Sequence, residues 1–455
     1  MPWRRSISMN VRAIVLAAGK GTRMKSRIPK VLHEVCGRPM LWYTLHALRA
    51  AGISDIVVVT NDELQARIAE FDVQGVVQSE QLGTGHAVKI ALEATHPRPG
   101  SRVVIAYADM PLITDEIFAR VVTALDGGKP AVMSLVTVKM PLPSNFGRIV
   151  RGGDDEVERI VEARDADANE LAIDEMNAGI YAFDESELRE GVAALKNDNV
   201  QQEYYLTDTV GYFVTGGKRV RPVVVTDPLQ TLGINDRVEL AIARREMNAR
   251  IAAGHMRDGV TILDPATTYL EPELAIGRDT VIYPNTSISL LSTIGENCAI
   301  GPNTRISDSR VGNGVEICES VVVQSDIGDD SKVGPFAHIR GHAKLDGGNR
   351  IGNFVEIKNS HLARGAKSAH LAYLGDSTIG EDTNIGAGTI TCNFDGERKN
   401  RTTIGKNVSI GSNTSIVAPR TIGDNALTGA GSVVTKDVAP GERVAGNPAK
   451  PIPKK

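Results

Sequence analysis

The sequence has few aromatic residues, and they are unevenly distributed. Only 4% of its 455 residues are Phe, Trp or Tyr, whereas 45 are glycine. The region 259–455 holds 25 of these glycines but only 6 of the 19 aromatic residues. A core built on large rings is therefore excluded for this region, and frequent tight turns are expected there.

Cysteine, an excess of one charge and long apolar runs are also scarce. Cys36, Cys298, Cys318 and Cys392 form no CxxC pair and no metal-ligand spacing, which favours a reducing, cytoplasmic location. The 51 basic and 55 acidic residues give a net charge of −4, which argues against a nucleic-acid partner. No run of eighteen apolar residues is present, so no membrane span is expected. A chain that is 42% hydrophobic is not disordered overall.

In the first half, short apolar segments alternate with helical patterns. The predicted strands are 13–16, 56–60, 103–107, 131–138 and 220–225, and the predicted helices between them include 40–51 and 84–94. Several strands are apolar throughout, as in a sheet that is covered on both faces. The alternation predicts an α/β domain with a Rossmann-like, mostly parallel sheet over residues 1–237. In such a sheet, ligands bind at the carboxyl ends of the strands.

A helical pattern follows this domain. Residues 238–252 have apolar positions at helical spacing and contain no Gly or Pro. They predict a helix that ends at Gly254, within a linker at 238–258.

Aliphatic residues recur every six positions in the remaining region, 259–455. The series comprises Ile276, Ile282, Ile288, Ile294, Ile300 and Ile306, then Ile327, Val333, Ile339, Leu345, Ile351 and Ile357, and finally Ile404, Ile410, Ile416 and Ile422. A period of six fits neither an α-helix nor a single strand. It predicts a parallel β-helix in which the aliphatic side chains point inward and stack from coil to coil. Taken alone, the repeat is equally compatible with a solenoid that has no chemistry of its own.

A glycine-rich loop follows the first predicted strand. The segment AAGKGTRM (17–24) comes directly after Leu16 and is followed by a Pro-Lys pair that ends at Lys30. Backbone N–H groups of such a loop can approach phosphates, and cations such as Arg23 and Lys30 can neutralise a triphosphate. The alternative is a tight strand-to-helix turn without a ligand.

The LAAGxGTRM motif with its downstream Pro-Lys resembles the sugar-nucleotidyltransferase family. These enzymes convert a nucleoside triphosphate and a sugar 1-phosphate into a nucleoside-diphospho-sugar and pyrophosphate. QSEQLGTGHA (78–87) resembles the family's uracil-reading segment, and YADMPL (107–112) resembles its metal-binding turn. The resemblance implies a site for UTP and the UDP-sugar made of Leu16, Ala17, Ala18, Gly19, Lys30, Gln78, Gly83, Thr84, Asp109, Gly147, Glu162, Asn177 and Asn235.

The same resemblance implies a metal site and two catalytic cations. Asp109 and Asn235 would bind Mg²⁺, a hard cation that prefers a few oxygen ligands from the protein. Arg23 and Lys30 would stabilise the transition state of phosphoryl transfer. Without the family context, Asp109 could equally cap a turn, and Glu162 could be a solvated surface residue.

A histidine lies where the six-residue repeat is interrupted. His370, in SAHLAYLGD (368–376), falls between Ile357 and Ile379. A neutral imidazole can take a proton from an attacking amine near neutral pH, although a lone histidine is more often structural. A β-helix of hexapeptide repeats resembles a large family of acyltransferases that fold as left-handed β-helices. Members of this family bind coenzyme A between neighbouring subunits of a trimer.

Together, the two halves resemble a bacterial family of bifunctional enzymes that join an N-acetylglucosamine-1-phosphate uridyltransferase to a glucosamine-1-phosphate N-acetyltransferase. The resemblance covers about residues 10–450 and is strongest in GNFVEIK (352–358) and NIGAGTITCN (384–393). It implies a homotrimer that uses UTP, acetyl-CoA and Mg²⁺, with His370 as the base. It also implies that glucosamine 1-phosphate is bound by Arg340, Lys358, Tyr373, Asn384 and Lys399, and acetyl-CoA by Ala387, Asn393, Phe394, Ser412 and Ala430.

The sequence departs from this family's pattern in a few places. Ala108 stands for a usual Gly, Ala178 for a Thr and Phe394 for a Tyr, and Arg340 is followed by Gly-His rather than Pro-Gly. Two other interpretations stay open. One is a single-activity sugar-nucleotidyltransferase whose β-helix oligomerises or regulates, and the other is a non-enzymatic scaffold of the kind found in some translation-factor subunits. His370 together with Lys358, Tyr373 and Asn384 argues against the first, and the glycine-rich loop with Asp109 and Asn235 argues against the second. The two-activity interpretation is therefore favoured.

Overall fold

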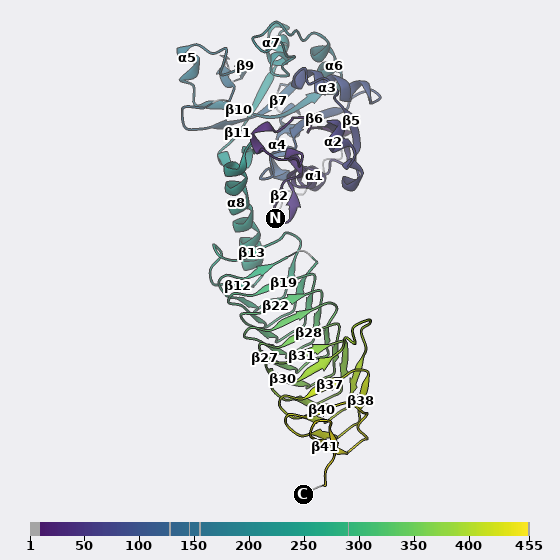
Figure 1. Cartoon of the computed structure of the whole chain (residues 1–455). Helices are drawn as coiled ribbons and strands as arrows, with labels where there is room; N and C mark the ends of the chain where they lie inside the picture. The colour runs from purple at the N-terminus through teal and green to yellow at the C-terminus, as the bar shows by residue number, and fades with distance from the viewer. Residues whose placement is uncertain (1–9, 127–128, 145, 154–155, 290, 454–455) are drawn as a thin grey trace. The chain divides into compact units, whose positions relative to one another are not determined.

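The computed structural model describes residues 10–126, 129–144, 146–153, 156–289 and 291–453. The chain divides into two units, Met1–Glu246 and Met247–Lys455 (Figure 1). Within the described ranges, no helix is long and apolar enough to cross a membrane.

A nine-stranded sheet forms the centre of the first unit. Its main path has the order β11-β7-β10-β6-β1-β4-β5, and β8 and β9 are attached through β10. The strands are β1 (Val11–Leu16), β4 (Asp55–Thr60), β5 (Gln74–Val77), β6 (Arg102–Tyr107), β7 (Met133–Lys139), β8 (Arg148–Arg151), β9 (Val157–Val161), β10 (Glu175–Asp184) and β11 (Val220–Val225). Along the main path, all neighbours pair in parallel except that β10 is antiparallel to β6 and β7. The predicted mostly parallel α/β sheet is confirmed.

Helices cover both faces of this sheet. On one face lie α1 (Met40–Ala50) and α4 (Asp115–Thr123), and on the other lie α3 (Thr84–Glu93), α6 (Glu185–Ala193) and α7 (Asp208–Thr215). The buried strand β1 serves both cores, because Val15 packs with the first group and Ile14 with the second. This two-sided burial explains why the strands read as continuous apolar runs.

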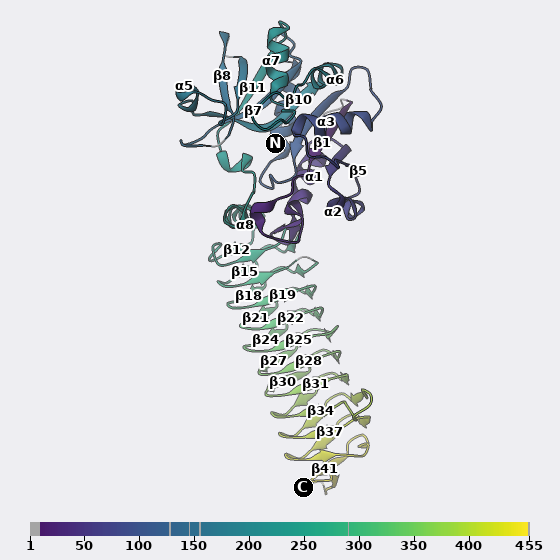
Figure 2. The same cartoon turned by 45° about the horizontal axis from the view of Figure 1, so that its top comes forward.

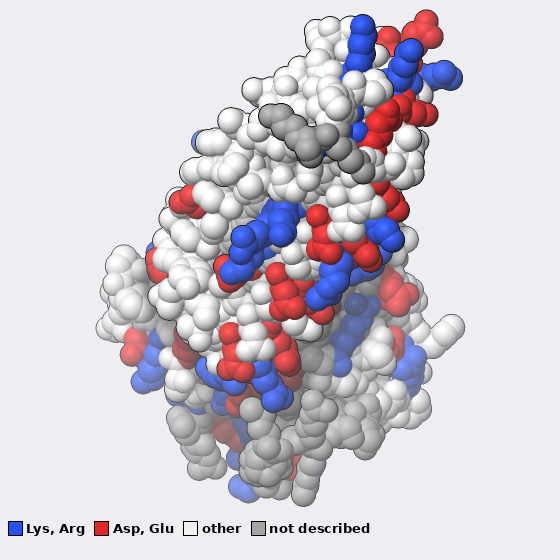
Figure 3. All heavy atoms as spheres, turned by 90° about the horizontal axis from the view of Figure 1, so that it is seen from below, with Lys and Arg blue, Asp and Glu red and all other residues white. Residues whose placement is uncertain are grey.

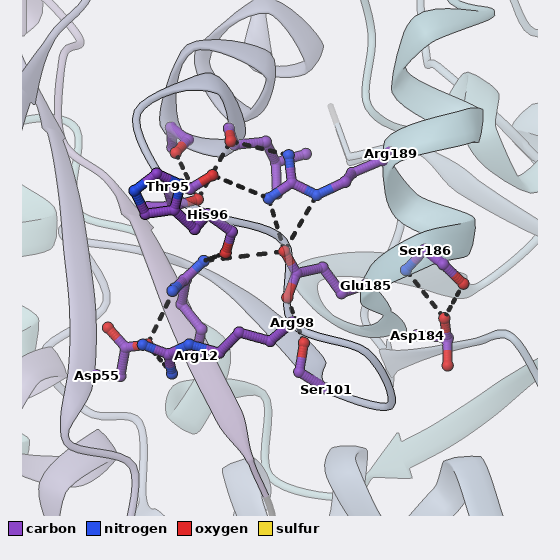
Figure 4. Close-up of polar contacts among 12 residues, drawn as sticks. Arg12, Asp55, Thr95, His96, Arg98, Ser101, Asp184, Glu185, Ser186 and Arg189 are labelled. Atoms are coloured by element: carbon purple, nitrogen blue, oxygen red, sulfur yellow. Dashed lines mark hydrogen bonds and ion pairs between the residues drawn. The ribbon is translucent and has the colours of Figure 1, made fainter.

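A buried polar network holds the end of the sheet where β1 begins (Figure 4). The Arg12 Nε donates to Asp55 Oδ2 at 3.0 Å, and its Nη1 lies 3.8 Å from Glu185 Oε1. Glu185 is only 2% exposed and also accepts two hydrogen bonds from the Arg189 guanidinium. Because each buried charge has a partner, the network stabilises this end without an uncompensated charge. The opposite end of the sheet, where β1 ends, borders a cleft.

One helix, α8 (Arg237–Arg257), spans the sequence boundary between the units. The prediction that it ends at Gly254 is wrong, because the helix continues for another turn. It stops where Gly259 adopts φ +98° and the Val260 N–H donates to the His255 carbonyl at 3.0 Å. This is a Schellman C-cap, which needs a left-handed residue just past the helix. Gly254 adopts no such conformation and is tolerated inside the helix.

Three sheets form the faces of a β-helix in the second unit (Figures 1 and 2). The first face runs from β12 (Thr261–Ile262) to β42, the second from β13 (Tyr269–Leu270) to β40 (Val433–Val434) and the third from β14 (Ala275–Ile276) to β38 (Arg420–Ile422). Each strand pairs in parallel with the equivalent strand one coil later, as β15 (Val281–Ile282) does with β18 (Ala299–Ile300). Among the strands that the structure describes in these three sheets, only β42 (Lys450–Pro451) is antiparallel to its neighbour. The predicted left-handed parallel β-helix of hexapeptide repeats is confirmed.

Nine strands of this β-helix carry the residues discussed below. They are β25 (His338–Arg340), β27 (Arg350–Asn353), β28 (Glu356–Lys358), β30 (Lys367–His370), β31 (Tyr373–Gly375), β33 (Asn384–Ile385), β34 (Ile390–Cys392), β36 (Ser409–Ile410) and β39 (Leu427–Thr428). We call the turn after first-face strands the first corner, and the turn after second-face strands the second corner.

The six-residue register shortens locally without breaking the stack. After Ile306, the next inward residues are Val311, Ile317 and Val322, all buried. Pairing from coil to coil continues through these shorter turns, because Thr293 pairs with Arg310 one coil later. The interior therefore stays filled with aliphatic side chains through this interruption. In later coils, buried Ser368 and Thr391 take inward positions, in register with Ile351 and Ile416.

Charged side chains of both signs are interspersed on the face seen in Figure 3. Blue and red groups alternate over that face. This mixture follows from the near balance of 51 basic and 55 acidic residues in the chain.

Candidate active sites

A cleft of about 290 Å³ opens at the carboxyl ends of β1, β4 and β6. Such an edge is where parallel α/β sheets bind their ligands. The cleft is lined by Leu16, Ala17, Ala18, Gly19, Lys30, Val31, Val59, Gln78, Gln81, Gly83, Thr84, Ala87, Tyr107, Asp109 and Glu203. The structure thus brings most of the expected nucleotide-binding residues around one cavity.

Lys30 joins the two expected metal ligands. Its Nζ lies 2.5 Å from Asp109 Oδ2 and 2.9 Å from Asn235 Oδ1. The Ile234 N–H donates to the Asp109 carbonyl at 2.9 Å, which fixes the segment of Asn235 against the end of β6. The two side-chain oxygens therefore converge on one cationic group. One carboxylate and one amide oxygen are also a donor set that suits Mg²⁺.

The close approach of Lys30 depends on a glycine in the preceding loop. Gly21 has φ +58°, and a Cβ there would lie 2.6 Å from the Lys30 Cβ. A larger residue would be strained by its backbone conformation and would also push Lys30 away. By contrast, Arg23 is exposed and lines neither of the two cavities described in this unit.

One amide side chain holds the 78–87 segment against the glycine-rich loop, and another makes a hydrogen bond within the segment. Gln78 Nε2 donates to the Gly83 carbonyl at 3.2 Å, and Gln81 Nε2 donates to the Ala18 carbonyl at 2.6 Å. Sequence reasoning missed Gln81 as a contributor, as it missed Glu203 in the cleft wall. Both positions become evident only when distant segments meet.

A strap at 203–206 fixes the start of α3 at the cleft. The Gly85 N–H donates to the Tyr204 carbonyl at 2.8 Å, and the Thr84 Oγ1 accepts from the Leu206 N–H at 3.1 Å. Gly83 has φ +104°, and a Cβ there would lie 2.6 Å from the Tyr204 carbonyl oxygen. The segment can therefore lie this close to the strap only with glycine at position 83.

We expect Gly83→Ala to weaken the nucleotide end. The substitution combines a disfavoured backbone conformation with a clash against the strap, so the free energy of unfolding of the first unit should fall by about 1–3 kcal/mol. The KM for the expected nucleotide substrate should rise at the same time. Urea unfolding and steady-state kinetics measure the two effects. Gly254→Ala is the control, because nothing lies within 4 Å of its added Cβ.

A second cavity, of about 340 Å³, adjoins the first and shares Thr84, Tyr107 and Glu203 with it. Its walls include Glu162 and Asn177, both expected sugar ligands. Gly147 lies beside them, because its carbonyl accepts from the Asn177 N–H at 2.9 Å. The three expected sugar-binding residues are thus neighbours.

Polar groups with restricted solvation line this second cavity. Burial raises the pKa of Glu162, and a hydrogen bond from the Thr207 hydroxyl at 3.2 Å opposes that rise. Asn177 Nδ2 donates to the Tyr181 hydroxyl at 2.7 Å, and burial raises the pKa of that phenol. A carboxyl group and an amide held in this way can bind the hydroxyl groups of a sugar.

In the β-helix, His370 is oriented by an asparagine. His370 pairs in register with Asn353 one coil earlier, and its Nδ1 lies 2.8 Å from Asn353 Oδ1. An amide oxygen only accepts hydrogen bonds, so Nδ1 carries the proton in this arrangement and the Nε2 lone pair is free. The exposed imidazole can therefore act as a base through Nε2. The pairing with Asn353 was not predicted, although Asn353 lies in the GNFVEIK segment (352–358).

Three cations meet at the second corner. Arg340 and Lys358 pair in register at the ends of β25 and β28, and Arg340 Nε also donates to Glu356 Oε1 at 2.8 Å. The nearby Lys399 ammonium, and to a lesser degree the Arg340 guanidinium, lower the pKa of Lys358. Like charges held this close favour an anion such as a phosphate monoester.

A small hairpin, 393–400, places Lys399 at this corner. The backbones of Phe394 and Lys399 form an antiparallel β-bridge, and the Asn400 N–H donates to the Asn393 carbonyl at 2.7 Å. Hydrogen bonds from the backbone N–H groups of residues 398 and 397 and from the Asn400 side chain lower the pKa of Asp395 to about 2. The hairpin is therefore held by its own carboxylate.

The expected acetyl-CoA residues fall into two groups within one chain. Ala387, Ser412 and Ala430 lie at the first corner in successive coils, continuing the line of His370. Asn393 and Phe394 lie at the second corner, in the hairpin. Asn384 opens β33 on the first face, in register with Lys367, and so lies apart from the three cations.

Comparisons with known proteins agree for the two units. Residues 13–172 match the family described as MobA-like NTP transferase domain, and residues 401–436 match bacterial transferase hexapeptide (six repeats). The chain is 43% identical to the bifunctional protein GlmU of Brevibacillus brevis, over 94% of this chain and 93% of the relative. It is 45% identical to that of Exiguobacterium sibiricum, over 94% and 96%, and 44% identical to that of Mycolicibacterium gilvum, over 94% and 88%.

Proposed function

The chain belongs to the GlmU family of bifunctional proteins, and we propose that it makes UDP-N-acetylglucosamine by two reactions. The first transfers acetyl from acetyl-CoA to glucosamine 1-phosphate, and the second transfers uridylyl from UTP to the acetylated product with release of pyrophosphate. The proposal is carried by the His370–Asn353 pair, with a three-cation cluster in the same or adjoining coils. A single-activity nucleotidyltransferase has no need of that pair.

The acetyl transfer follows from the chemistry of the β-helix residues. Arg340, Lys358 and Lys399 hold the phosphate of glucosamine 1-phosphate at the second corner. His370 Nε2 removes a proton from the amine as its nitrogen forms a bond to the thioester carbon. The carbon–sulfur bond then breaks, and coenzyme A leaves as the thiol once its sulfur is protonated. Tyr373 and Asn384 are further proposed ligands of the sugar phosphate.

The uridylyl transfer takes place in the first unit. A phosphate oxygen of N-acetylglucosamine 1-phosphate attacks the α-phosphorus of UTP, and pyrophosphate leaves. Lys30 and Arg23 stabilise the charge on the phosphates, and the glycine-rich loop places its N–H groups beside them. Gln78 binds the uracil, while Glu162 and Asn177 bind the sugar in the adjoining cavity.

A divalent cation is part of this proposal. Asp109 and Asn235 supply two converging oxygens and would hold Mg²⁺, with the Lys30 ammonium then available to the phosphates. The ion would supply charge neutralisation to the triphosphate. The proposed location is the cytoplasm, because the four cysteines are scattered along the sequence and form no CxxC pair.

A homotrimer is the proposed assembly, and an exposed apolar row supports it. Phe336, Phe354 and Leu371 are 53%, 59% and 62% exposed and follow one another along the first corner. All three have positive φ, between 47° and 59°, where glycine or asparagine is usual. Bulky apolar groups retained in this strained setting are expected to be covered by another subunit. The two separated groups of acetyl-CoA residues would then meet across neighbouring subunits.

Replacing Phe336 and Phe354 with serine should therefore dissociate the assembly. Their stacked rings, with centroids 5.4 Å apart, would be lost from the interface. The mass measured by light scattering should fall from three chains to one, and acetyl transfer should decrease with it. Serine at Tyr269, an exposed aromatic residue in an earlier coil, is the control. An unchanged mass for the double variant would contradict the proposed interface.

Paired assays of the purified chain test the function. Thiol release from acetyl-CoA must require glucosamine 1-phosphate, and pyrophosphate release from UTP must require its acetylated product. Pyrophosphate release without thiol release would favour a single-activity nucleotidyltransferase. The absence of both would favour a non-enzymatic scaffold.

A further inference from the structure

Tyr373 has an unusual place at the second corner. Gly375 occupies the register position that Arg340 and Lys358 occupy in the two preceding coils. A Cβ at Gly375 would lie 2.5 Å from the Tyr373 Oη and 2.6 Å from its Cζ. The phenol ring thus fills the place where a side chain of residue 375 would begin. The hydroxyl is thereby brought into the row of the two cations.

Glycine at position 375 is not required by its backbone. Its φ lies outside the left-handed region, so alanine can adopt the same conformation. Thr391 Oγ1 accepts from the Gly375 N–H at 2.8 Å, a bond that alanine would keep. What excludes a side chain is the ring of Tyr373. A methyl group there would move the phenol without breaking the coil.

The next residue, Asp376, holds an amide beside the same phenol. Asp376 is 6% exposed, and its Oδ2 accepts from Asn393 Nδ2 at 2.5 Å. The same Asn393 nitrogen lies 3.4 Å from the Tyr373 Oη. The other oxygen, Oδ1, accepts from Asn359 Nδ2 at 2.5 Å. A buried carboxylate with two fixed amide donors is rigid, so it sets the orientation of Asn393.

We propose that Gly375 and Asp376 are positioning residues that hold the Tyr373 hydroxyl at the phosphate-binding corner. Gly375 does so by leaving room for the ring, and Asp376 does so through Asn393. The inference rests on the proposed acetyl transfer and assigns a role to the Gly-Asp pair that follows Tyr373. Both residues act through Tyr373 and touch no reacting atom.

A double-mutant cycle tests the role of Gly375. Gly375→Ala should raise the KM for glucosamine 1-phosphate by roughly 10-fold, with a smaller change in kcat, because a hydrogen bond to a charged group is lost. In the Tyr373→Ala background, the same substitution should have no further effect, since the ring that it displaces is absent. Equal effects of Gly375→Ala in both backgrounds would overturn the proposal.

Asp376→Asn provides a second, independent cycle. Asp376→Asn should raise the KM for glucosamine 1-phosphate. In the Asn393→Ala background, this effect on the KM should vanish. A loss that persists in that background would show that Asp376 acts only on the fold.

Two controls separate positioning from stability and from the proposed function. Gly277→Ala places a Cβ 2.6 Å from the Glu296 backbone nitrogen in an earlier coil, so it should lower the Tm without raising the KM. A rise in KM for Gly277→Ala as well would mean that general destabilisation explains the result. Absence of acetyl transfer in the unaltered protein would instead refute the proposed function.

Discussion

Replacing His370 with alanine is expected to lower the kcat of acetyl transfer by about 10²–10⁴-fold, the usual contribution of a general base. The Nδ1–H of His370 is committed to Asn353, so Nε2 is the nitrogen that accepts the proton of the amine. Uridylyl transfer should be unchanged, because it takes place in the other unit of the chain. Rates of thiol release and pyrophosphate release, measured on one preparation, check both statements.

His361 is the matched control for this substitution. It is a histidine of the same β-helix, on the third face, and its Nε2 lies 2.7 Å from Asp346 Oδ2. His361→Ala removes an exposed pair of small energetic value and should leave both activities intact. If His370→Ala abolished uridylyl transfer as well, the assignment of two separate sites would be wrong.

Lys30→Met is expected to reduce kcat/KM for uridylyl transfer by on the order of 10²–10³-fold, as removal of one preorganised charge at a reacting phosphate does. The substitution keeps most of the aliphatic side chain but removes the ammonium that contacts Asp109 and Asn235. Asp109 is only 18% exposed, so its carboxylate would also lose its partner in a poorly solvated place. Acetyl transfer should stay unchanged.

Lys196→Met is the matched control, because Lys196 is exposed and lies outside both cavities. It should alter neither activity. Isothermal titration of UTP into Lys30→Met would separate lost binding from lost catalysis. A variant with full uridylyl transfer would remove Lys30 from the proposed mechanism.

Periodicity made most of the fold predictable. Apolar runs of β1 and β4 identified buried parallel strands, and the six-residue series from Ile276 identified the β-helix. β10 was not predicted as a strand, because Asn177 and Gly179 interrupt its apolar run where its pairing with β7 is irregular. The end of α8 was predicted wrongly because Gly254 was taken as the end of the helix. The hydrogen bonds of the C-cap at Gly259, which end the helix, cannot be seen in the sequence.

The candidate sites were predictable only where they follow a local motif. The glycine-rich loop and Asp109 lie beside strands, and their positions could be read directly. Asn353 and Asp376 could not, because their roles depend on neighbours one coil away, and coil-to-coil register is set by turns of variable length. Arg23 and Asn384 are the opposite case. The family resemblance predicted both as site residues, but within one chain Arg23 lies outside the nucleotide cleft and Asn384 lies apart from the three cations.

The line of first-corner residues also limits the length of the donor that can bind along it. One residue per coil, from Asn353 through His370, Ala387 and Ser412 to Ala430, spans four strand spacings, or roughly 19 Å. A donor bound along it must be long and narrow, with its reactive end at the imidazole and its body reaching toward the C-terminus. The number of coils after His370 thus determines how much of the acetyl donor can contact the protein. The number of coils before His370 can vary without changing the length of this contact.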